Sequence, residues 1–123
     1  MDSEKARILI VEDEIVIGAL LQELFEDAGF QVKVCETGGE ALEAQSSNPA
    51  DLIIIDYGLP DQNGLDVCQK LSPAPNGRRP HTILATGWGM LEVSQYEHLV
   101  DVLLEKPFNM SALVKQVEGL LAS

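Results

Sequence analysis

The chain has 123 residues, of which 46% are hydrophobic and 5% aromatic, and its formal net charge is −12. This length and composition fit a single domain, residues 1–123, with one mainly aliphatic core. The acidic balance argues against a nucleic-acid-binding surface, which needs clustered Lys and Arg, and no stretch approaches the ~20 apolar residues of a membrane span.

The first elements alternate between strand and helix. Residues 7–11 are a short aliphatic run between charged residues, which predicts a strand buried on both faces. The apolar positions within 15–28 form one helical stripe, and Gly29 is placed to end that helix. Residues 30–35 alternate in polarity and predict a strand with one wetter face.

The middle of the chain repeats this pattern. Thr37 and Glu40 form a capping box that opens a helix over 38–47, and Asn48-Pro49 ends it. Residues 52–55 are predicted to form the most buried strand.

The second half begins with a turn-rich loop. It runs from Tyr57 to Gly64, and a helix follows at 64–71. The Pro- and Gly-rich segment 72–80 is irregular, and a fourth strand covers 82–85.

The last third is predicted to contain one weak and one strong helix. A short, weak helix is expected at 90–99, and a fifth strand at 102–104. The final helix presents its apolar stripe through Leu113, Val117, Leu120 and Leu121.

Five strand–helix units with strands this apolar predict an α/β fold. We expect a doubly wound, five-stranded parallel sheet of order 2-1-3-4-5 flanked by five helices, which is flavodoxin-like. In that order strands one, three, four and five are neighbours. Strand two, which ends in Cys35-Glu36, lies at the edge and away from the other strand ends.

Four of these strand ends carry polar or charged groups. They are Glu12-Asp13, Asp56, Thr86 and Lys106. Ligand sites in open parallel sheets form at the carboxyl ends of strands, so we expect these groups to converge. Carboxylates on adjacent strands repel each other unless a cation lies between them, and oxygen-only ligands favour Mg²⁺. The alternative is that the acids are solvent-facing helix caps, which we accept only for Glu14.

Each of these residues also has a chemical role open to it. A carboxylate at Asp56 can attack phosphorus and form an acyl phosphate. Lys106 offers a mobile positive charge, although most lysines simply lie on the surface, and Thr86 offers a hydroxyl donor. His81 and His98 fall away from the group, so no general base is evident.

Four sequence motifs together resemble the response-regulator (CheY-like) receiver domain of two-component signalling. They are Ile-Leu-Ile-Val-Glu-Asp-Glu (8–14), Asp-Tyr-Gly-Leu-Pro-Asp-Gln-Asn-Gly (56–64), Ala-Thr-Gly (85–87) and Glu-Lys-Pro-Phe (105–108). The resemblance implies that Asp56 is the phosphoacceptor. It further implies that Asp13 holds Mg²⁺ directly and Glu12 through water, with the backbone carbonyl of Gly58 as a further ligand. Thr86 and Lys106 would bind the phosphoryl oxygens, and Pro60 and Gly64 would shape the loop after the acceptor.

The resemblance also implies a function. The domain would take its phosphoryl group from a histidine kinase or a histidine phosphotransfer protein and then change a partner surface made of helix four, strand five and helix five. It would be a monomer or weak dimer that catalyses only its own phosphorylation and dephosphorylation. The alternatives are a Mg²⁺-dependent phosphatase or phosphotransferase working through an aspartyl phosphate, and a degenerate receiver that serves only for docking. A phosphatase or phosphotransferase would normally need an acid/base residue beside its nucleophile, but the residue two positions beyond Asp56 is Gly58.

Three features depart from the family pattern. One is the segment from Thr86 to Lys106, which is slightly short and contains glycine, so helix four is expected to be small or mobile. Leu103 stands where the family usually has Tyr or Phe, and Thr86 is followed by Gly87 and Trp88. The Ala-Thr-Gly-aromatic run partly resembles the receiver subgroup nicknamed FAT GUY. We therefore hypothesise that Trp88, between two glycines, replaces the missing aromatic as the moving part. The alternative is a half-buried loop aromatic without that role.

The remaining signals concern location. Cys35 and Cys68 fit no metal or redox spacing, and we expect buried or half-buried thiols. The polar start lacks a signal-peptide core, so the prediction is a cytoplasmic protein.

Overall fold

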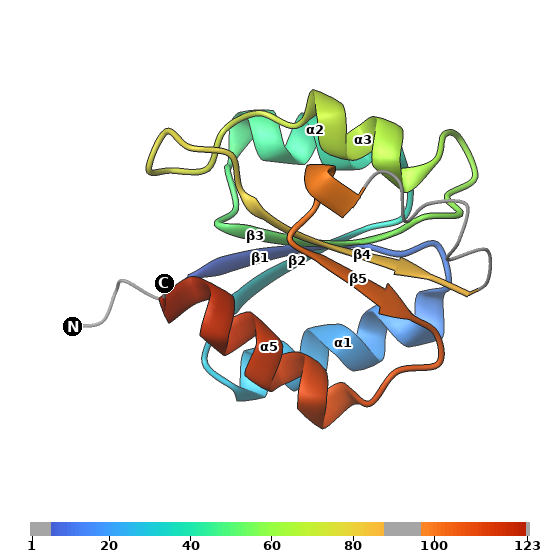
Figure 1. Ribbon diagram of the computed structural model, residues 1–123, viewed down its shortest axis with the longest axis vertical. Helices are drawn as coiled ribbons and strands as arrows, with labels where there is room; N and C mark the ends of the chain where they lie inside the picture. Colours follow the sequence, from blue (N-terminus) through green and yellow to red (C-terminus); the bar gives the residue numbers. More distant parts are fainter. Residues whose placement is uncertain (1–5, 88–96, 123) are drawn as a thin grey trace.

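The computed structural model describes residues 6–87 and 97–122 and contains one parallel five-stranded sheet (Figure 1). The strands are β1 (Arg7–Val11), β2 (Gln31–Cys35), β3 (Leu52–Asp56), β4 (His81–Thr86) and β5 (Val102–Glu105). Their order is β2-β1-β3-β4-β5, and every neighbouring pair is parallel. The order expected from the sequence is therefore confirmed.

Helices cover both faces of this sheet. They are α1 (Ile15–Asp27), α2 (Gly38–Ser47), α3 (Gly64–Lys70), the 3₁₀ helix η1 (Glu97–Leu99) and α5 (Met110–Ala122). In Figure 1, α2 and α3 lie on one face, and α1 and α5 lie on the other. Of the weak helix expected at 90–99, only η1 falls among the described residues. Positions 90–96 lie outside them.

The core consists of two apolar layers that the sheet separates. Side chains alternate along a strand, so Leu9 and Val11 face one layer while Ile8 and Ile10 face the other. Every residue of β3 is buried, which confirms the prediction that it is the most buried strand. The strands are fixed from both sides, and their carboxyl ends are therefore held in place.

The predicted helix boundaries follow local capping chemistry. α1 ends before Gly29, whose φ of 100° is a conformation that glycine adopts without steric cost. At the start of α2, the hydroxyl oxygen of Thr37 accepts from the backbone N–H of Glu40. The Glu40 carboxylate in turn accepts from the backbone N–H of Glu36, one residue earlier than in an ideal capping box.

A buried amide that the sequence did not single out joins two loops. The side chain of Gln45 is fully buried. Its Nε2 donates to the carbonyl oxygens of Ala50 (3.0 Å) and Ser72 (3.3 Å), and its Oε1 accepts from the backbone N–H of Ala50 (2.9 Å). Gln45 therefore links the loop after α2 to the loop after α3.

Two further expectations concern the thiols and the membrane. Cys35 and Cys68 are both buried and free, as predicted, and burial raises the pKa of the Cys68 thiol to about 12. Within residues 6–87 and 97–122, no helix is both long and apolar enough to cross a membrane.

Candidate functional site

Strand register brings the predicted site residues to one edge of the sheet. Val11 pairs with Ile55, so Glu12 and Asp13 follow β1 beside Asp56, the last residue of β3. Asp56 itself pairs with Ala85 of β4. Thr86 pairs with Glu105, which places Lys106 just beyond the end of β5. The convergence inferred from the sequence is therefore present in the structure.

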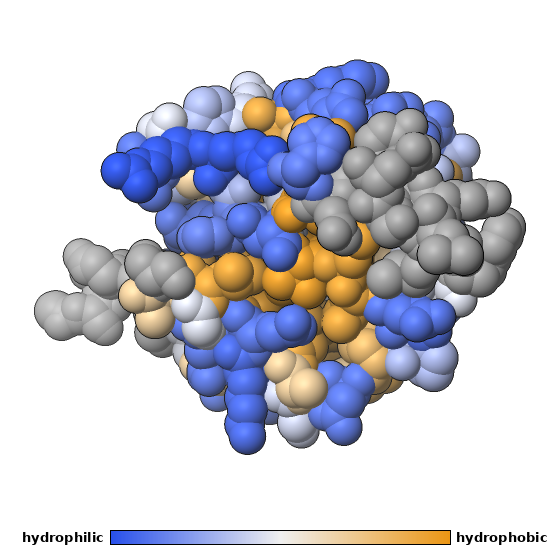
Figure 2. All heavy atoms as spheres, viewed as in Figure 1, coloured by the Kyte–Doolittle hydropathy of each residue, from blue (hydrophilic) through white to orange (hydrophobic). Residues whose placement is uncertain are grey.

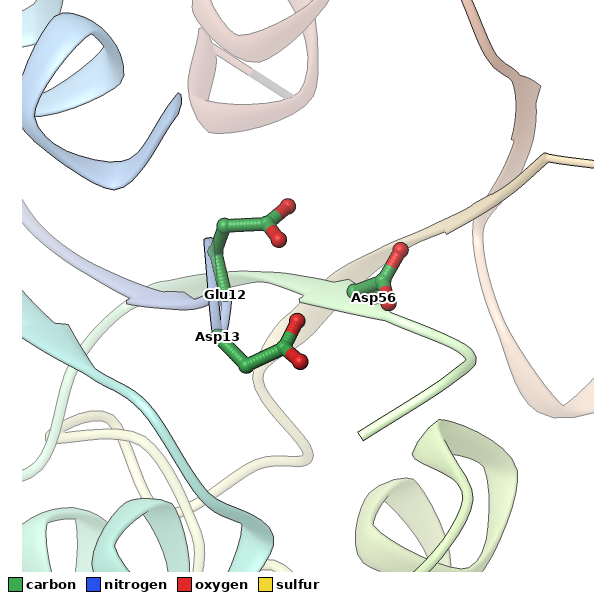
Figure 3. Close-up of side chains that lie close together, drawn as sticks. All are labelled: Glu12, Asp13 and Asp56. Atoms are coloured by element: carbon green, nitrogen blue, oxygen red, sulfur yellow. The ribbon is translucent and has the colours of Figure 1, made fainter. Parts of the chain in front are cut away.

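Three carboxylates form the acidic part of this edge. Glu12, Asp13 and Asp56 each offer an oxygen, and these oxygens all lie within 4.8 Å of one another. The three side chains approach one another from the ends of β1 and β3 (Figure 3). Glu12 and Asp56 are buried, whereas Asp13 is exposed. The cluster is thus anchored in the core on one side and open to solvent on the other.

Lys106 supplies the positive charge of the site. Its Nζ lies 2.6 Å from Oδ1 of Asp56 and 3.3 Å from Oε1 of Glu12. Burial alone would lower the pKa of Lys106, but the hydrogen bond to Asp56 and the charges of both carboxylates outweigh it and raise this pKa. The pKa of Glu12 is also raised, chiefly by burial. One ammonium group therefore faces two buried acids.

Backbone groups complete the contacts of the buried acids. Oε2 of Glu12 accepts from the N–H of Glu14 (3.1 Å), and Oδ2 of Asp56 accepts from the N–H of Gly58 (3.1 Å). Gly64 packs so closely against β3 that a Cβ there would lie 2.5 Å from the Asp56 carbonyl oxygen. The Asp56 carboxylate itself is held by the Lys106 ammonium group and the Gly58 N–H.

The donor set fits a hard divalent cation. The three clustered side chains provide oxygen only, and Mg²⁺ prefers such ligands while keeping several of its waters. The exposure of Asp13 leaves room for those waters. Glu12, Asp13 and Asp56 could therefore hold Mg²⁺.

The remaining predicted residues lie at different distances from the carboxylate cluster. Thr86 is buried at the end of β4, and its carbonyl oxygen accepts from the Lys106 N–H (2.8 Å). Leu103 is half-buried in β5 and packs against the core, while Trp88 lies outside the described residues. His81 begins β4 at the opposite edge, where its Nδ1 lies 3.7 Å from Oδ2 of Asp101.

One residue near the site was missed by sequence reasoning. The carboxylate of Asp61 accepts from the backbone N–H groups of Gly38 and Gly39, both at 2.9 Å. These partners are 23 and 22 residues away, so no local motif marks the contact. Asp61 belongs to the quoted motif 56–64, but nothing in that motif names its partners in α2.

Comparisons with known proteins agree with this geometry. A family model described as "Response regulator receiver domain" matches residues 8–118. This chain belongs to that family. The receiver domain is a signalling module, which disfavours the alternative of a phosphatase or phosphotransferase.

Solved receiver structures share the fold closely. A CheY-like receiver domain from Methanospirillum hungatei superposes with a TM-score of 0.87 at 28% identity and covers 96% of this chain and 94% of its own. The receiver domain of a signal transduction histidine kinase from Syntrophus aciditrophicus gives a TM-score of 0.83 at 30% identity, covering 95% and 90%.

Curated relatives include larger regulators. The transcriptional regulatory protein CusR of Escherichia coli is 36% identical over 117 residues, covering 94% of this chain and 51% of its own length. The DNA-binding response regulator MtrA of Mycobacterium tuberculosis is 33% identical over 122 residues, covering 98% and 53%. The receiver domain thus spans about half the length of these relatives.

Proposed function

We propose that Asp56 accepts a phosphoryl group from a histidine kinase or a histidine phosphotransfer protein, with Mg²⁺ held beside it. One observation carries the proposal: the oxygens of Glu12, Asp13 and Asp56 lie within 4.8 Å of one another while Lys106 Nζ lies 2.6 Å from Asp56. Anionic metal ligands next to a nucleophilic oxygen and a cation are the components that phosphoryl transfer requires.

The transfer step uses few protein groups. An Asp56 oxygen attacks phosphorus, the phosphorus–nitrogen bond of the donor phosphohistidine breaks, and its electron pair stays with the imidazole. Lys106 is within reach to move from the Asp56 carboxylate to a phosphoryl oxygen, and we assign the Thr86 hydroxyl to a second one. We assign the Gly58 carbonyl as the last protein ligand of the metal. When bound, Mg²⁺ supplies positive charge that offsets the charge of the phosphoryl oxygens.

The donor is expected to dock over α1. This helix starts two residues after Asp13 and exposes Ile15 (71%), Val16 (71%) and Leu20 (48%). Exposed large apolar side chains grouped on one helix mark an interaction surface. A donor helix that covers them would bring its phosphohistidine to the open side of the acidic cluster.

The output surface is proposed at the β5 edge of the sheet. Figure 2 shows apolar surface along the β5 edge of the sheet, bordered by hydrophilic residues. Val102, Leu103 and Leu104 of β5 are each half-buried there. We keep the prediction that β5 and α5, together with the segment before them, contact a downstream protein.

The moving part of the switch is assigned to Trp88 on the sequence alone. Leu103 lacks the ring that usually reports phosphorylation in receivers, and Trp88 is the only tryptophan. Its emission should change when Mg²⁺ and a phosphoryl mimic are added, and unchanged emission would contradict this role. The partial likeness to the FAT GUY subgroup depends only on residues 84–88, and none of the relatives described above carries that name.

The test of the proposed function is direct phosphorylation. Incubation with acetyl phosphate and Mg²⁺ should add one phosphoryl group, about 80 Da, as an acyl phosphate visible in the intact mass. Asp56→Asn should abolish the adduct, whereas Asp66→Asn, at an exposed acid of α3, should keep it. An adduct that persists in Asp56→Asn would overturn the assignment. Turnover of a small phosphomonoester beyond one equivalent would favour the enzyme alternative.

A cytoplasmic location is part of the same proposal. The buried free thiols of Cys35 and Cys68 fit a reducing compartment, in which histidine kinases present their phosphohistidine.

A further inference from the structure

The loop that follows the acceptor is held at its base by backbone contacts. The N–H of Tyr57 donates to Ala85 of β4, and the N–H of Gly64 donates to the carbonyl of Tyr57, both at 2.8 Å. Gly58 and Asn63 form an antiparallel bridge between these two points. The base is therefore a closed hairpin, and Gly58, next to Asp56, lies in one of its arms.

The tip of the same loop is held by Asp61. Its two carboxylate oxygens accept one N–H each from Gly38 and Gly39, at the start of α2. The first N–H groups of a helix have no partner within the helix, and the helix dipole favours an anion there. The pKa of Asp61 is lowered because these two backbone hydrogen bonds stabilise its charged form.

The α2 end of this contact is built for close approach. A Cβ on Gly38 would lie 2.7 Å from Cγ2 of Val67 and 2.8 Å from Cγ of Gln62, both too near for a real contact. Val67 is fully buried and cannot give way easily. Gly39 differs, because its Cβ would meet only Oδ2 of Asp61, at an ordinary 3.5 Å. A glycine at position 38 thus lets α2 reach the loop.

Thr37 caps the same helix without reaching the loop. Its hydroxyl oxygen accepts from the N–H of Glu40, within the same turn of chain. Removal of either cap weakens the start of α2, but only removal of the Asp61 carboxylate also frees the loop tip. The two residues therefore form a matched pair for experiment.

We infer that Asp61 is a positioning residue for the metal site, because it anchors the loop carrying Gly58 to the first turn of α2. The inference rests on the proposed function, in which the Gly58 carbonyl is a Mg²⁺ ligand. An anchored loop presents that carbonyl in place, whereas a loop held only at its base must be ordered when the metal binds. Coupling of this kind is reciprocal, so metal binding also orders the start of α2.

The first experiment compares Asp61→Ala with Thr37→Ala in calorimetric titrations with Mg²⁺ alone. Removal of a residue that hydrogen-bonds to a metal ligand typically weakens metal binding by about 10–100-fold. Asp61 does not contact Gly58 directly but holds the loop that carries it, so we expect about 3- to 10-fold weaker Mg²⁺ binding for Asp61→Ala. Thr37→Ala weakens the same helix start but keeps the two hydrogen bonds to Asp61, so it should lose clearly less Mg²⁺ affinity than Asp61→Ala. Equal affinities in the two variants would overturn the inference.

The second experiment approaches the contact from the other side. Gly38→Ala should weaken Mg²⁺ binding, because its methyl group cannot fit against the buried Val67 and displaces Gln62 and the loop from α2, while Gly39→Ala should not. In wild-type protein, the amide resonances of Gly38 and Gly39 should shift on Mg²⁺ addition, and in Asp61→Ala these shifts should shrink. This readout remains informative if one alanine variant folds poorly. Unshifted wild-type resonances during Mg²⁺ saturation would contradict the coupling.

Failure of the proposed function is distinguishable from failure of this inference. If acetyl phosphate labels wild-type Asp56 but all four variants bind Mg²⁺ equally, only the positioning role is wrong. If wild-type protein binds Mg²⁺ and shows the Asp61 dependence but accepts no phosphoryl group, the metal inference stands and the acceptor function fails.

Discussion

Lys106 Nζ lies 2.6 Å from Oδ1 of Asp56, although the two residues are separated by 50 positions in the chain. The contact exists because β4 lies between β3 and β5 and aligns their carboxyl ends. In this arrangement the ammonium group partly offsets the charge of Asp56. The same group is within reach of any phosphoryl oxygen bound at that carboxylate.

Replacement of the lysine should slow phosphorylation strongly. Lys106→Met removes a preorganised donor from the developing charge, and such losses reduce rates by about 10²-fold or more. The rate is measured with acetyl phosphate at saturating Mg²⁺. Lys115→Met, at an exposed position of α5, is the control and should leave the rate unchanged. Equal rates in the two variants would remove Lys106 from the chemistry.

Gly64 should tolerate no side chain, because its backbone packs against the Asp56 carbonyl. In Gly64→Ala the new Cβ would lie 2.5 Å from the Asp56 carbonyl oxygen and 2.9 Å from Leu84 Cδ1. We expect a loss of about 1–3 kcal/mol in the free energy of unfolding, measured with urea, together with slower phosphorylation. In Gly119→Ala the Cβ meets nothing within 4 Å, so helix α5 should gain about 0.5–1 kcal/mol. If Gly64→Ala is as stable as wild type, the backbone around Asp56 shifts to make room for the methyl group, and this prediction is wrong.

The buried amide of Gln45 should matter for stability and not for chemistry. Gln45→Leu leaves the N–H and C=O of Ala50 unpaired, and each such buried group costs about 1–3 kcal/mol. We expect a total loss of about 2–6 kcal/mol in urea unfolding, with phosphorylation of the folded fraction retained. Gln116→Leu, on an exposed turn of α5, should change stability by less than about 0.5 kcal/mol. If Gln45→Leu loses no more unfolding free energy than Gln116→Leu, water replaces the hydrogen bonds of the Gln45 amide, and this prediction is wrong.

Acid stability should depend on Asp61. Its folded-state pKa lies below the ordinary 3.8, so its contribution is complete above that pH and is lost as pH falls through the lower folded value. In Asp61→Asn the carboxylate no longer titrates. Below pH 4, the free energy of unfolding of Asp61→Asn, measured with urea, should therefore fall less steeply with falling pH than that of wild type. The difference should match the titration of about one carboxyl group. Identical pH profiles would show that the two hydrogen bonds do not favour the charged form.

Much of this fold was predictable because strand ends and core positions leave local signals. The aliphatic run at 7–11 and the buried run at 52–55 fix two central strands, and each is followed at once by an acid. In a parallel sheet these ends must share an edge, so Glu12, Asp13 and Asp56 could be placed together before any coordinates.

The contacts that sequence reasoning missed are those between distant polar groups. Gln45 follows the buried Ala41 by one turn of α2, so its burial fits the helical period, but its hydrogen-bond partners lie in two loops. Asp61 meets Gly38 across 23 residues, a pairing fixed by how α2 and the loop 57–63 pack. The partners of these two side chains are distant in the sequence, so no local pattern predicts them.

The most direct test of the central claim is a crystal structure with Mg²⁺ and beryllofluoride, a mimic of the phosphoryl group. We predict one beryllofluoride on an oxygen of Asp56, with Mg²⁺ bound by Asp13, Asp56 and the Gly58 carbonyl, and with Thr86 and Lys106 on the fluorine atoms. An adduct on another side chain, or a metal bound away from Asp13 and Asp56, would contradict the account.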